Sequence, residues 1–375
     1  MKKFTILHTI ETAGPGGAET VVLELASRLD PSRFRSVALI PREDWLSKNL
    51  RERGVTTHLV DSKAWHDFRL PRGMARVVRD EKVDLIHSHL PGQNFYSCMV
   101  GKWAGCKTVA TYHGALELAQ SQGPRGAIML GTVRHTADAV VVVCDFMGKM
   151  LQDIKFPAKK IVRIYNGIQV ENYEVPSDGR LRNELGLRNG TKIVGTVANL
   201  RQTKGYAYFV EAAGKVLAAA PDTRFVAIGD IKDEIAQPLY RALKQMGIED
   251  RFHFLGFRKD VPELLNELDV FVLASVSEGF PLVALQAMAA SRPMVVTRSG
   301  GPQEIVDDGS TGFLVPPADS GALAEKIAAL LRDPGRAKEF ARAARAKVGN
   351  VFSIEKMISE YESLYERLLR GGCAQ

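Results

Sequence analysis

The stretch SVSEGFPLVALQAMAASRPMVVTRSGGPQEIVDDGSTGFLVP, residues 275–316, decides the fold of this chain. It follows the apolar run LDVFVLAS (268–275), which is typical of a strand buried on both faces of a parallel sheet. The chain must turn after that strand, and Pro281 suits the first turn of a helix because its φ is fixed and it has no N–H. We expect the helix that follows to bury Leu282, Val283, Leu285, Ala287, Met288 and Ala289.

Glu278 lies in this turn, at the carboxyl end of the predicted strand and just before the helix. Open α/β sheets bind their ligands at this place, and the free amides of the first helical turn favour an anion or a hydroxyl-rich ligand. Gln286 comes eight residues later, about two turns along the helix and on a similar face.

The Glu278–Gln286 spacing resembles a signature of retaining GT-B glycosyltransferases of family 4, in which a Glu is followed after seven residues by a second Glu. The second Glu is Gln286 here. EGFPL, SGGPQEIV (299–306) and DGSTGFLVP (308–316) also resemble that family. The alternative is a turn and helix with an incidental acidic residue, which does not account for the Gly-Phe-Pro context.

The resemblance implies a donor site at this turn. Glu278 and the backbone of Gly279, Phe280, Pro281 and Leu282 would hold the sugar hydroxyls, and Gln286 would bind the ribose.

Composition is that of an ordinary globular protein of two domains, with 375 residues, 45% of them hydrophobic and 25% charged. No run is long enough to span a membrane, and MKKFTILHTI is too strand-like for a signal peptide, so we expect a cytoplasmic protein. The four cysteines show no metal spacing and are read as reduced, and no D-x-D pair occurs. We expect no bound metal, no cofactor and no nucleic-acid partner.

The net charge of +7 is uneven along the chain. Residues 1–168 hold 24 Lys+Arg against 16 Asp+Glu, whereas residues 169–351 hold 23 of each. The basic excess therefore belongs to the first half.

A strand over 4–10 runs into a glycine-rich loop that includes Gly16 and Gly17, and a helix follows. Such a loop lets a ligand approach the backbone, but Glu19 breaks the dinucleotide fingerprint and the Lys-Ser/Thr of a P-loop is absent. A merely tight turn is the alternative. GPGGAE resembles the family's glycine loop, which implies that Gly16 and Gly17 contact the donor.

Strand and helix signals then alternate, which indicates βαβ units and a parallel sheet. His87 and His89 are two apart on one predicted strand and so share a face; metal binding, packing and acceptor contact are the alternatives. His113 follows the strand KTVATY (107–112). The resemblance implies that His113 reaches toward the transferred sugar, with a partly buried structural histidine as the alternative.

After a linker over 169–190, a second βα series begins at TKIVGTVANL (191–200) and continues into RQTKG (201–205). Lys204 and Arg201 are positioned to hold a diphosphate through charge-assisted hydrogen bonds, or else to be a solvated loop pair. The family usually has Arg where this chain has Asn199, so we expect Arg201 to supply that charge. The resemblance implies that Gly256 and Phe257, at a later strand end, line the pocket for the base.

The last predicted helix has apolar residues at 354, 357, 358, 361, 364, 365 and 368. In the family this helix crosses back to the first domain. The expected fold is therefore α/β, GT-B, with two Rossmann-like domains facing across a cleft. Residues 1–168 with 352–375 would bind the acceptor, and residues 169–351 the nucleotide sugar.

The function we expect is metal-independent, retaining transfer of a hexose-type sugar from a nucleotide sugar, with UDP as the expected nucleotide. The acceptor would be a glycan or lipid-linked molecule in cell-surface polysaccharide or glycolipid synthesis. Glu278, His113, Lys204 and Arg201 would form the catalytic group. A nucleotide-sugar epimerase of the same fold is one alternative, and a non-catalytic sugar-binding protein is a second.

A basic helix is predicted within 63–82, where Lys63, Arg69, Arg72, Arg76, Arg79 and Lys82 alternate with apolar residues that include Trp65. One interpretation is an ordinary surface helix that packs its apolar side on its own sheet. The alternative is that its basic face rests on anionic lipid at the inner face of the membrane.

Overall fold

The computed structural model describes residues 2–61, 67–119 and 123–371, so Lys63 and Trp65 lie outside the described residues. The chain divides into two compact units, the first formed by Met1–Gly167 with Ile354–Gln375 and the second by Ile168–Ser353. The expected boundaries differ from these by one or two residues.

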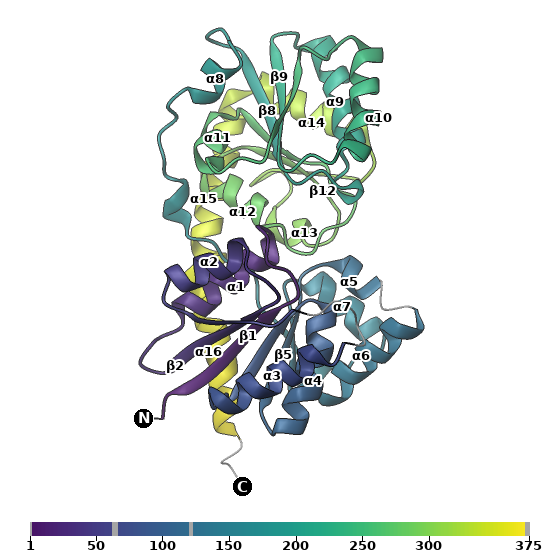
Figure 1. Cartoon of the computed structure of the whole chain (residues 1–375). Coiled ribbons are helices and arrows are strands. Elements are labelled where there is room, and N and C mark those ends of the chain that lie inside the picture. The colour runs from purple at the N-terminus through teal and green to yellow at the C-terminus, as the bar shows by residue number, and fades with distance from the viewer. Residues whose placement is uncertain (1, 62–66, 120–122, 372–375) are drawn as a thin grey trace. The chain divides into compact units, whose positions relative to one another are not determined.

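A parallel sheet forms the centre of the first unit (Figure 1). Its strand order is β3-β2-β1-β4-β5-β6-β7. Its strands are β1 (Phe4–Ile10), β2 (Phe34–Ile40), β3 (Thr56–Leu59), β4 (Leu85–His89), β5 (Lys107–Tyr112), β6 (Ala139–Val142) and β7 (Ile161–Arg163). The strand order reverses between β1 and β4, and the carboxyl ends at such a switch point are where open α/β sheets bind ligands.

Helices cover both faces of this sheet: α1 (Gly17–Arg28), α2 (Trp45–Glu52), α3 (Arg69–Asp80), α4 (Pro91–Ala104), α5 (Ala115–Ala119), α6 (Pro124–Thr136), α7 (Asp145–Asp153) and α16 (Ile354–Arg370). Alternate residues of β2 face opposite sides. Val37 and Leu39 pack with the apolar side of α3 and with α4, whereas Ala38 and Ile40 pack with α1 and α2.

The last helix, α16, belongs to the first unit, as predicted. Tyr361 and Tyr365 are fully buried, and the ring of Tyr365 contacts Phe34 edge to face. Arg33 forms ion pairs with Glu362 at 3.0 Å and Glu366 at 2.9 Å. These contacts return the end of the chain to the unit that contains its beginning.

The second unit repeats the same topology, with order β10-β9-β8-β11-β12-β13. Its strands are β8 (Lys192–Val197), β9 (Thr223–Ile228), β10 (Phe252–Gly256), β11 (Val270–Leu273), β12 (Met294–Thr297) and β13 (Phe313–Val315). Its helices are α8 (Arg180–Glu184), α9 (Tyr206–Ala219), α10 (Asp233–Met246), α11 (Val261–Glu267), α12 (Leu282–Ala289), α13 (Pro302–Ile305), α14 (Ser320–Arg332) and α15 (Pro334–Val351). Two Rossmann-like units are therefore confirmed.

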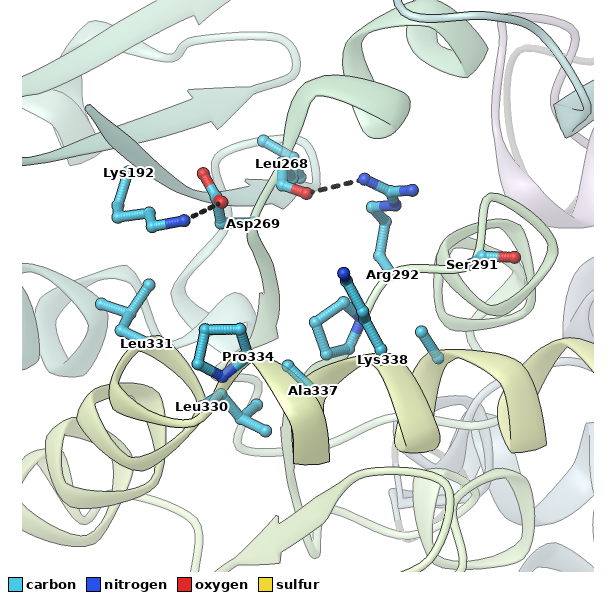
Figure 2. A pocket seen from close by; sticks show the side chains of 12 residues that line it. Lys192, Leu268, Asp269, Ser291, Arg292, Leu330, Leu331, Pro334, Ala337 and Lys338 are labelled. Atoms are coloured by element: carbon cyan, nitrogen blue, oxygen red, sulfur yellow. Dashed lines mark hydrogen bonds and ion pairs between the residues drawn. The ribbon is translucent and has the colours of Figure 1, made fainter. Parts of the chain in front are cut away.

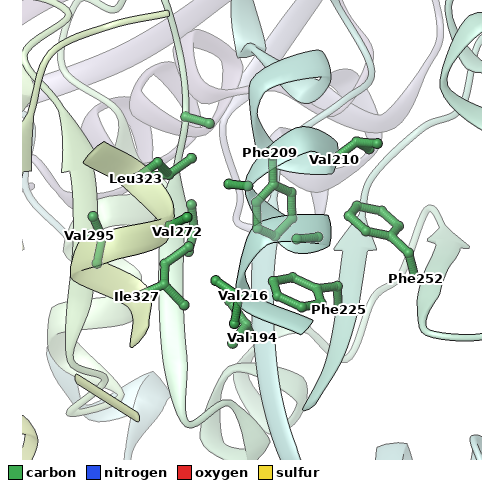
Figure 3. Close-up of a cluster of buried hydrophobic side chains, with 14 of the residues drawn as sticks. Val194, Phe209, Val210, Val216, Phe225, Phe252, Val272, Val295, Leu323 and Ile327 are labelled. Atoms are coloured by element: carbon green, nitrogen blue, oxygen red, sulfur yellow. The ribbon is translucent and has the colours of Figure 1, made fainter. Parts of the chain in front are cut away.

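The core of the second unit lies between its sheet and the helices α9 and α14 (Figure 3). Phe209 of α9 and Ile327 of α14 pack with strand residues such as Val194, Phe225 and Val272.

Around the stretch that decides the fold, the structure corrects three details of the prediction. The strand β11 is shorter than the apolar run, Pro281 is the N-cap of α12 and not part of its first turn, and Val283 is only half-buried.

Candidate active site

Two loops meet at the switch point of the second sheet, one after β8 and one after β11. Gly205, with φ of +66°, ends the first loop, and a Cβ atom there would clash with the carbonyl oxygen of Ala274. The N–H of Val276 donates to the carbonyl of Thr203 at 2.8 Å. Only glycine allows this approach, which fixes the two loops against each other.

Lys204 and Glu278 form an ion pair between these loops, with Nζ 2.7 Å from Oε1. The hydroxyl of Ser275 donates to the same carboxylate oxygen at 2.6 Å, and Glu278 is only 8% exposed. The N–H of Glu278 also donates to the carbonyl of Ser299 at 2.8 Å. The carboxylate is therefore held at the carboxyl edge of the sheet with a cation beside it.

Two further polar residues of the first loop, Arg201 and Asn199, are placed differently. Arg201 is exposed in extended backbone just before Lys204. Oδ1 of Asn199 accepts the N–H of Asp230 at 3.0 Å, which ties the end of β8 to the end of β9. Asn199 thus has a structural hydrogen bond at the position where the resembled family carries a charge.

The turn after Glu278 presents backbone and not side chains. Phe280 is buried and packs edge to face against Phe352, so its side chain belongs to the core. Gly301 lies so close to the carbonyl of Gly279 that a Cβ atom would not fit. Pro281 and Leu282 are buried, and Gln286 is half-buried on α12.

Gly256 and Phe257 lie at the carboxyl end of β10. Gly256 has φ of +70°, and its carbonyl accepts the N–H of Gly229 at 2.9 Å. The ring of Phe257 is 53% exposed. An exposed aromatic ring at this edge suits stacking with a planar ligand.

A pocket of about 270 Å³ lies at the amino ends of the strands of the second sheet (Figure 2). Lys192, which begins β8, pairs there with Asp269 at 2.9 Å, and Arg292 donates to the carbonyl of Leu268 at 3.0 Å. Because all strands of the sheet are parallel, the pocket lies at their amino ends, whereas Lys204 and Glu278 lie at their carboxyl ends. Three of the charged residues that line the pocket, Lys192, Asp269 and Arg292, are bonded to neighbouring parts of the fold, so we do not assign the pocket to the donor.

In the first unit, Gly16 is the N-cap of α1 and Gly17 is its first residue. The carboxylate of Glu19 folds back so closely that a Cβ atom on Gly16 would clash with it. Gly17 is exposed and has open space where its Cβ atom would be, so packing does not require glycine there.

His113 follows β5 and is half-buried. Its Nε2 lies 2.8 Å from Nδ1 of His89, and its backbone N–H donates to Glu117 at 3.0 Å. Burial lowers the pKa of His113 to about 4 and raises the pKa of the Glu117 carboxyl to about 8. Both groups are therefore largely uncharged near neutral pH.

His8, His87 and His89 lie together on one face of the first sheet, because His8 of β1 pairs in register with His87 of β4. One ring nitrogen from each lies within 4.8 Å of the others, so the structure supplies, in His8, a third potential metal ligand that the sequence did not reveal. Both nitrogens of His87 are already bonded, to Tyr365 at 2.6 Å and Thr111 at 2.7 Å. Because both ring nitrogens of His87 are taken by these hydrogen bonds, neither is free to bind a metal, and we favour the packing interpretation.

Sequence reasoning missed three residues that shape these sites: Ser275, His89 as a partner of His113, and Glu117. Ser275 had a signal, because it is a hydroxyl residue at the end of an apolar strand and three residues before Glu278. The pairing of His89 with His113 needed the β4–β5 register.

The fold and the placement of these residues define the class of GT-B glycosyltransferases, enzymes that use nucleotide sugars. Residues 177–347 match the model of Glycosyl transferases group 1, and residues 15–172 match that of Glycosyltransferase Family 4. The two models together cover most of the chain, which belongs to the GT-B glycosyltransferases of family 4.

Relatives of known name match along most of their length. The chain is 29% identical over 308 residues to N-acetyl-alpha-D-glucosaminyl L-malate synthase of Bacillus anthracis, covering 81% of this chain and 80% of that protein. It is 27% identical over 337 residues to UDP-Gal:alpha-D-GlcNAc-diphosphoundecaprenol alpha-1,3-galactosyltransferase of Escherichia coli, covering 87% and 86%.

Among solved structures, Anabaena HepE in complex with UDP and glucose superposes with a TM-score of 0.88 at 22% identity, over 97% of this chain and 100% of that one. That likeness supports the fold. Within the described residues, none of the helices has the length and apolar character needed to cross a bilayer.

Proposed function

We propose that this chain is a retaining, metal-independent hexosyltransferase that uses a UDP-sugar as donor and a glycan or lipid-linked molecule as acceptor. The observation that carries the proposal is the Lys204–Glu278 pair at the switch point of the second sheet. The names of the Escherichia coli relative and of the HepE complexes support UDP as the nucleotide.

In this reaction the bond between the anomeric carbon and the β-phosphate oxygen breaks, and its electron pair leaves with the nucleoside diphosphate. Lys204 stabilises that charge as it grows, with Arg201 as a second cation from the same loop. Glu278 and the backbone of Gly279 to Leu282 bind sugar hydroxyls. The acceptor oxygen bonds to the anomeric carbon on the face the phosphate leaves, and its proton passes to a phosphate oxygen.

Retention is supported by the Glu278–Gln286 spacing, which resembles the signature of a retaining family with Gln in place of its second Glu. Metal independence is supported by the lysine and arginine, which take the place that a divalent ion has in metal-dependent transferases. The roles proposed for the first unit are acceptor binding and, through His113, a contact with the sugar.

The test is release of UDP from a panel of UDP-sugars in the presence of EDTA, with and without a polyprenyl-diphosphate glycolipid. Release that requires the acceptor, and a product whose anomeric configuration matches the donor by NMR, supports the proposal. Conversion of the UDP-sugar without any acceptor would instead favour the epimerase. Loss of all activity in EDTA, restored by Mg²⁺ or Mn²⁺, would contradict metal independence.

The basic face of α3 supports peripheral contact with an anionic membrane as part of this proposal. The apolar side of α3 packs on its own sheet through Leu70, Met74, Val77 and Val78. The exposed side is basic, and in the described part of the chain Arg72 and Arg76 have no ion-pair partner. Each cation near an anionic surface contributes about 1 kcal/mol, so this face suits electrostatic attachment near a lipid-linked acceptor.

A further inference from the structure

His89 and His113 form a histidine pair at the carboxyl edge of the first sheet. His89 ends β4, His113 follows β5, and these strands are neighbours in the sheet. Nδ1 of His89 lies 2.8 Å from Nε2 of His113, and the two rings are inclined by 22°. His89 is fully buried, whereas His113 is half-buried.

Each ring of this pair carries a single proton near neutral pH. Burial lowers the pKa of His89 well below its ordinary value and that of His113 to about 4. A neutral imidazole has one N–H and one acceptor nitrogen. The bond between the rings therefore has two possible arrangements, which differ in the atom of His113 that bears its proton.

The buried Nε2 of His89 distinguishes the two arrangements, because it has no hydrogen-bond partner among the described residues. If His113 donated from Nε2, the proton of His89 would lie on that unpaired nitrogen, as a buried N–H without an acceptor. If His89 donates from Nδ1, its unpaired Nε2 carries no proton and is only an unsatisfied acceptor. Orphaned buried N–H groups are rare in folded proteins, and unsatisfied acceptors are less so.

We infer that Nδ1–H of His89 donates to Nε2 of His113, which places the proton of His113 on Nδ1. That nitrogen has no hydrogen-bond partner in the described part of the chain. His89 is thus a positioning residue: it makes His113 a neutral donor toward a ligand oxygen. A sugar hydroxyl is the matching chemistry, so this role rests on the proposed function.

The orientation of His89 is itself fixed by buried neighbours. The ring of His87 lies 4.2 Å from that of His89, centroid to centroid. His87 is bonded on both sides, by Tyr365 of α16 and Thr111 of β5. The last helix of the chain therefore helps to hold the pair in place.

The proton position can be measured without turnover. In ¹⁵N-histidine NMR spectra of the whole protein, with His113 assigned through His113→Asn, we expect His113 to be the Nδ1–H tautomer. His89→Leu should remove this preference. The matched control is His8→Leu, which changes another fully buried histidine on the same sheet and should leave His113 unchanged. An Nε2–H tautomer of His113 in the unaltered protein would overturn the inference.

Kinetics tests the positioning role. His89→Asn keeps an N–H donor near the place of Nδ1 and should retain kcat within about twofold, whereas His89→Leu should lower kcat about tenfold, the effect of one hydrogen bond. His89→Leu and His113→Ala together should lower kcat no further than His113→Ala alone. If the tautomer is as expected but His89→Leu transfers sugar at the unaltered rate, the positioning role fails and the transferase function stands. A chain without any transferase activity would remove the proposed function and leave the tautomer result intact.

Discussion

Nζ of Lys204 lies 2.7 Å from Oε1 of Glu278, although the two residues are 74 positions apart in the chain. The pair exists because β8 and β11 are neighbours at the point where the strand order reverses. Each charge of the pair is neutralised by the other. When a donor binds, we expect its diphosphate to pair with Lys204 and its sugar hydroxyls to donate hydrogen bonds to Glu278.

Glu278→Gln should reduce transfer by about 10² to 10³-fold, because the amide lacks the charge that holds the sugar and Lys204 in the transition state. The fold should remain, because a Gln amide can still accept from Ser275. Melting temperature and kcat, measured together, check this, with exposed Glu325→Gln as the control. An unchanged kcat in Glu278→Gln would show that Glu278 is not part of the active site.

Gln286→Glu should be tolerated, with a loss in kcat/KM of less than about tenfold, since both side chains accept a hydrogen bond from a ribose hydroxyl. The measurement is kcat/KM for the UDP-sugar. If Gln286→Glu is as damaging as Glu278→Gln, the assignment of this helix position to the ribose is wrong.

Mild acid should unfold the first unit through its buried histidines. The pKa of His8 is lowered by burial to about 3, and those of His87 and His89 are also well below normal. The unfolded chain takes up these protons near pH 6.5 and the folded chain does not, so the histidine contribution to stability is complete above pH 6.5 and falls as the pH drops below it. The loss is roughly 1.4 kcal/mol per pH unit for each buried histidine.

Tryptophan fluorescence reports on this part of the chain, because all three tryptophans of the sequence precede residue 168. The urea midpoint should decrease as the pH is lowered from 6.5 to 4.5, and His8→Gln should make this dependence on pH less steep. The pKa of Glu117, raised by burial to about 8, acts in the opposite direction, because its stabilising contribution is lost as the pH rises from 4.5 toward 8. A flat profile would show that the histidines are not buried in neutral form.

Arg72→Glu with Arg76→Glu should abolish binding to vesicles that contain anionic lipid, and binding by the unaltered protein should weaken as salt screens it. Co-sedimentation over a salt series measures this. The control is Arg241→Glu with Lys244→Glu, the same charge change on exposed positions of α10 in the second unit. No binding at low salt by the unaltered protein would exclude the membrane interpretation.

Local features of the fold could be predicted from the sequence because short-range physics determines them. The apolar run of β1 has the predicted bounds, Phe4–Ile10, and Gly205 marks the start of α9 through its positive φ. The ends of β11 were overestimated, because Ala274 and Ser275 are buried without pairing in the sheet, so apolarity alone does not locate the strand end.

Contacts between strands could not be predicted in the same way. The approach of His8 to His87 depends on the β1–β4 register, and the bond from Asn199 to Asp230 depends on the neighbouring end of β9. The sequence indicated which residues lie at strand ends, and only the strand order decided which of them meet.

The central claim, that Lys204 stabilises the departing diphosphate, is tested most directly by the kcat of acceptor-dependent UDP release in Lys204→Ala and in Lys192→Ala. Lys192 is the matched control, since it also pairs with an acidic residue but lies at the opposite edge of the same sheet. We predict that kcat falls about 10² to 10³-fold in Lys204→Ala, with a smaller loss of UDP affinity, and stays within about twofold in Lys192→Ala. An unaltered kcat in Lys204→Ala, with only the acceptor KM changed, would contradict the account.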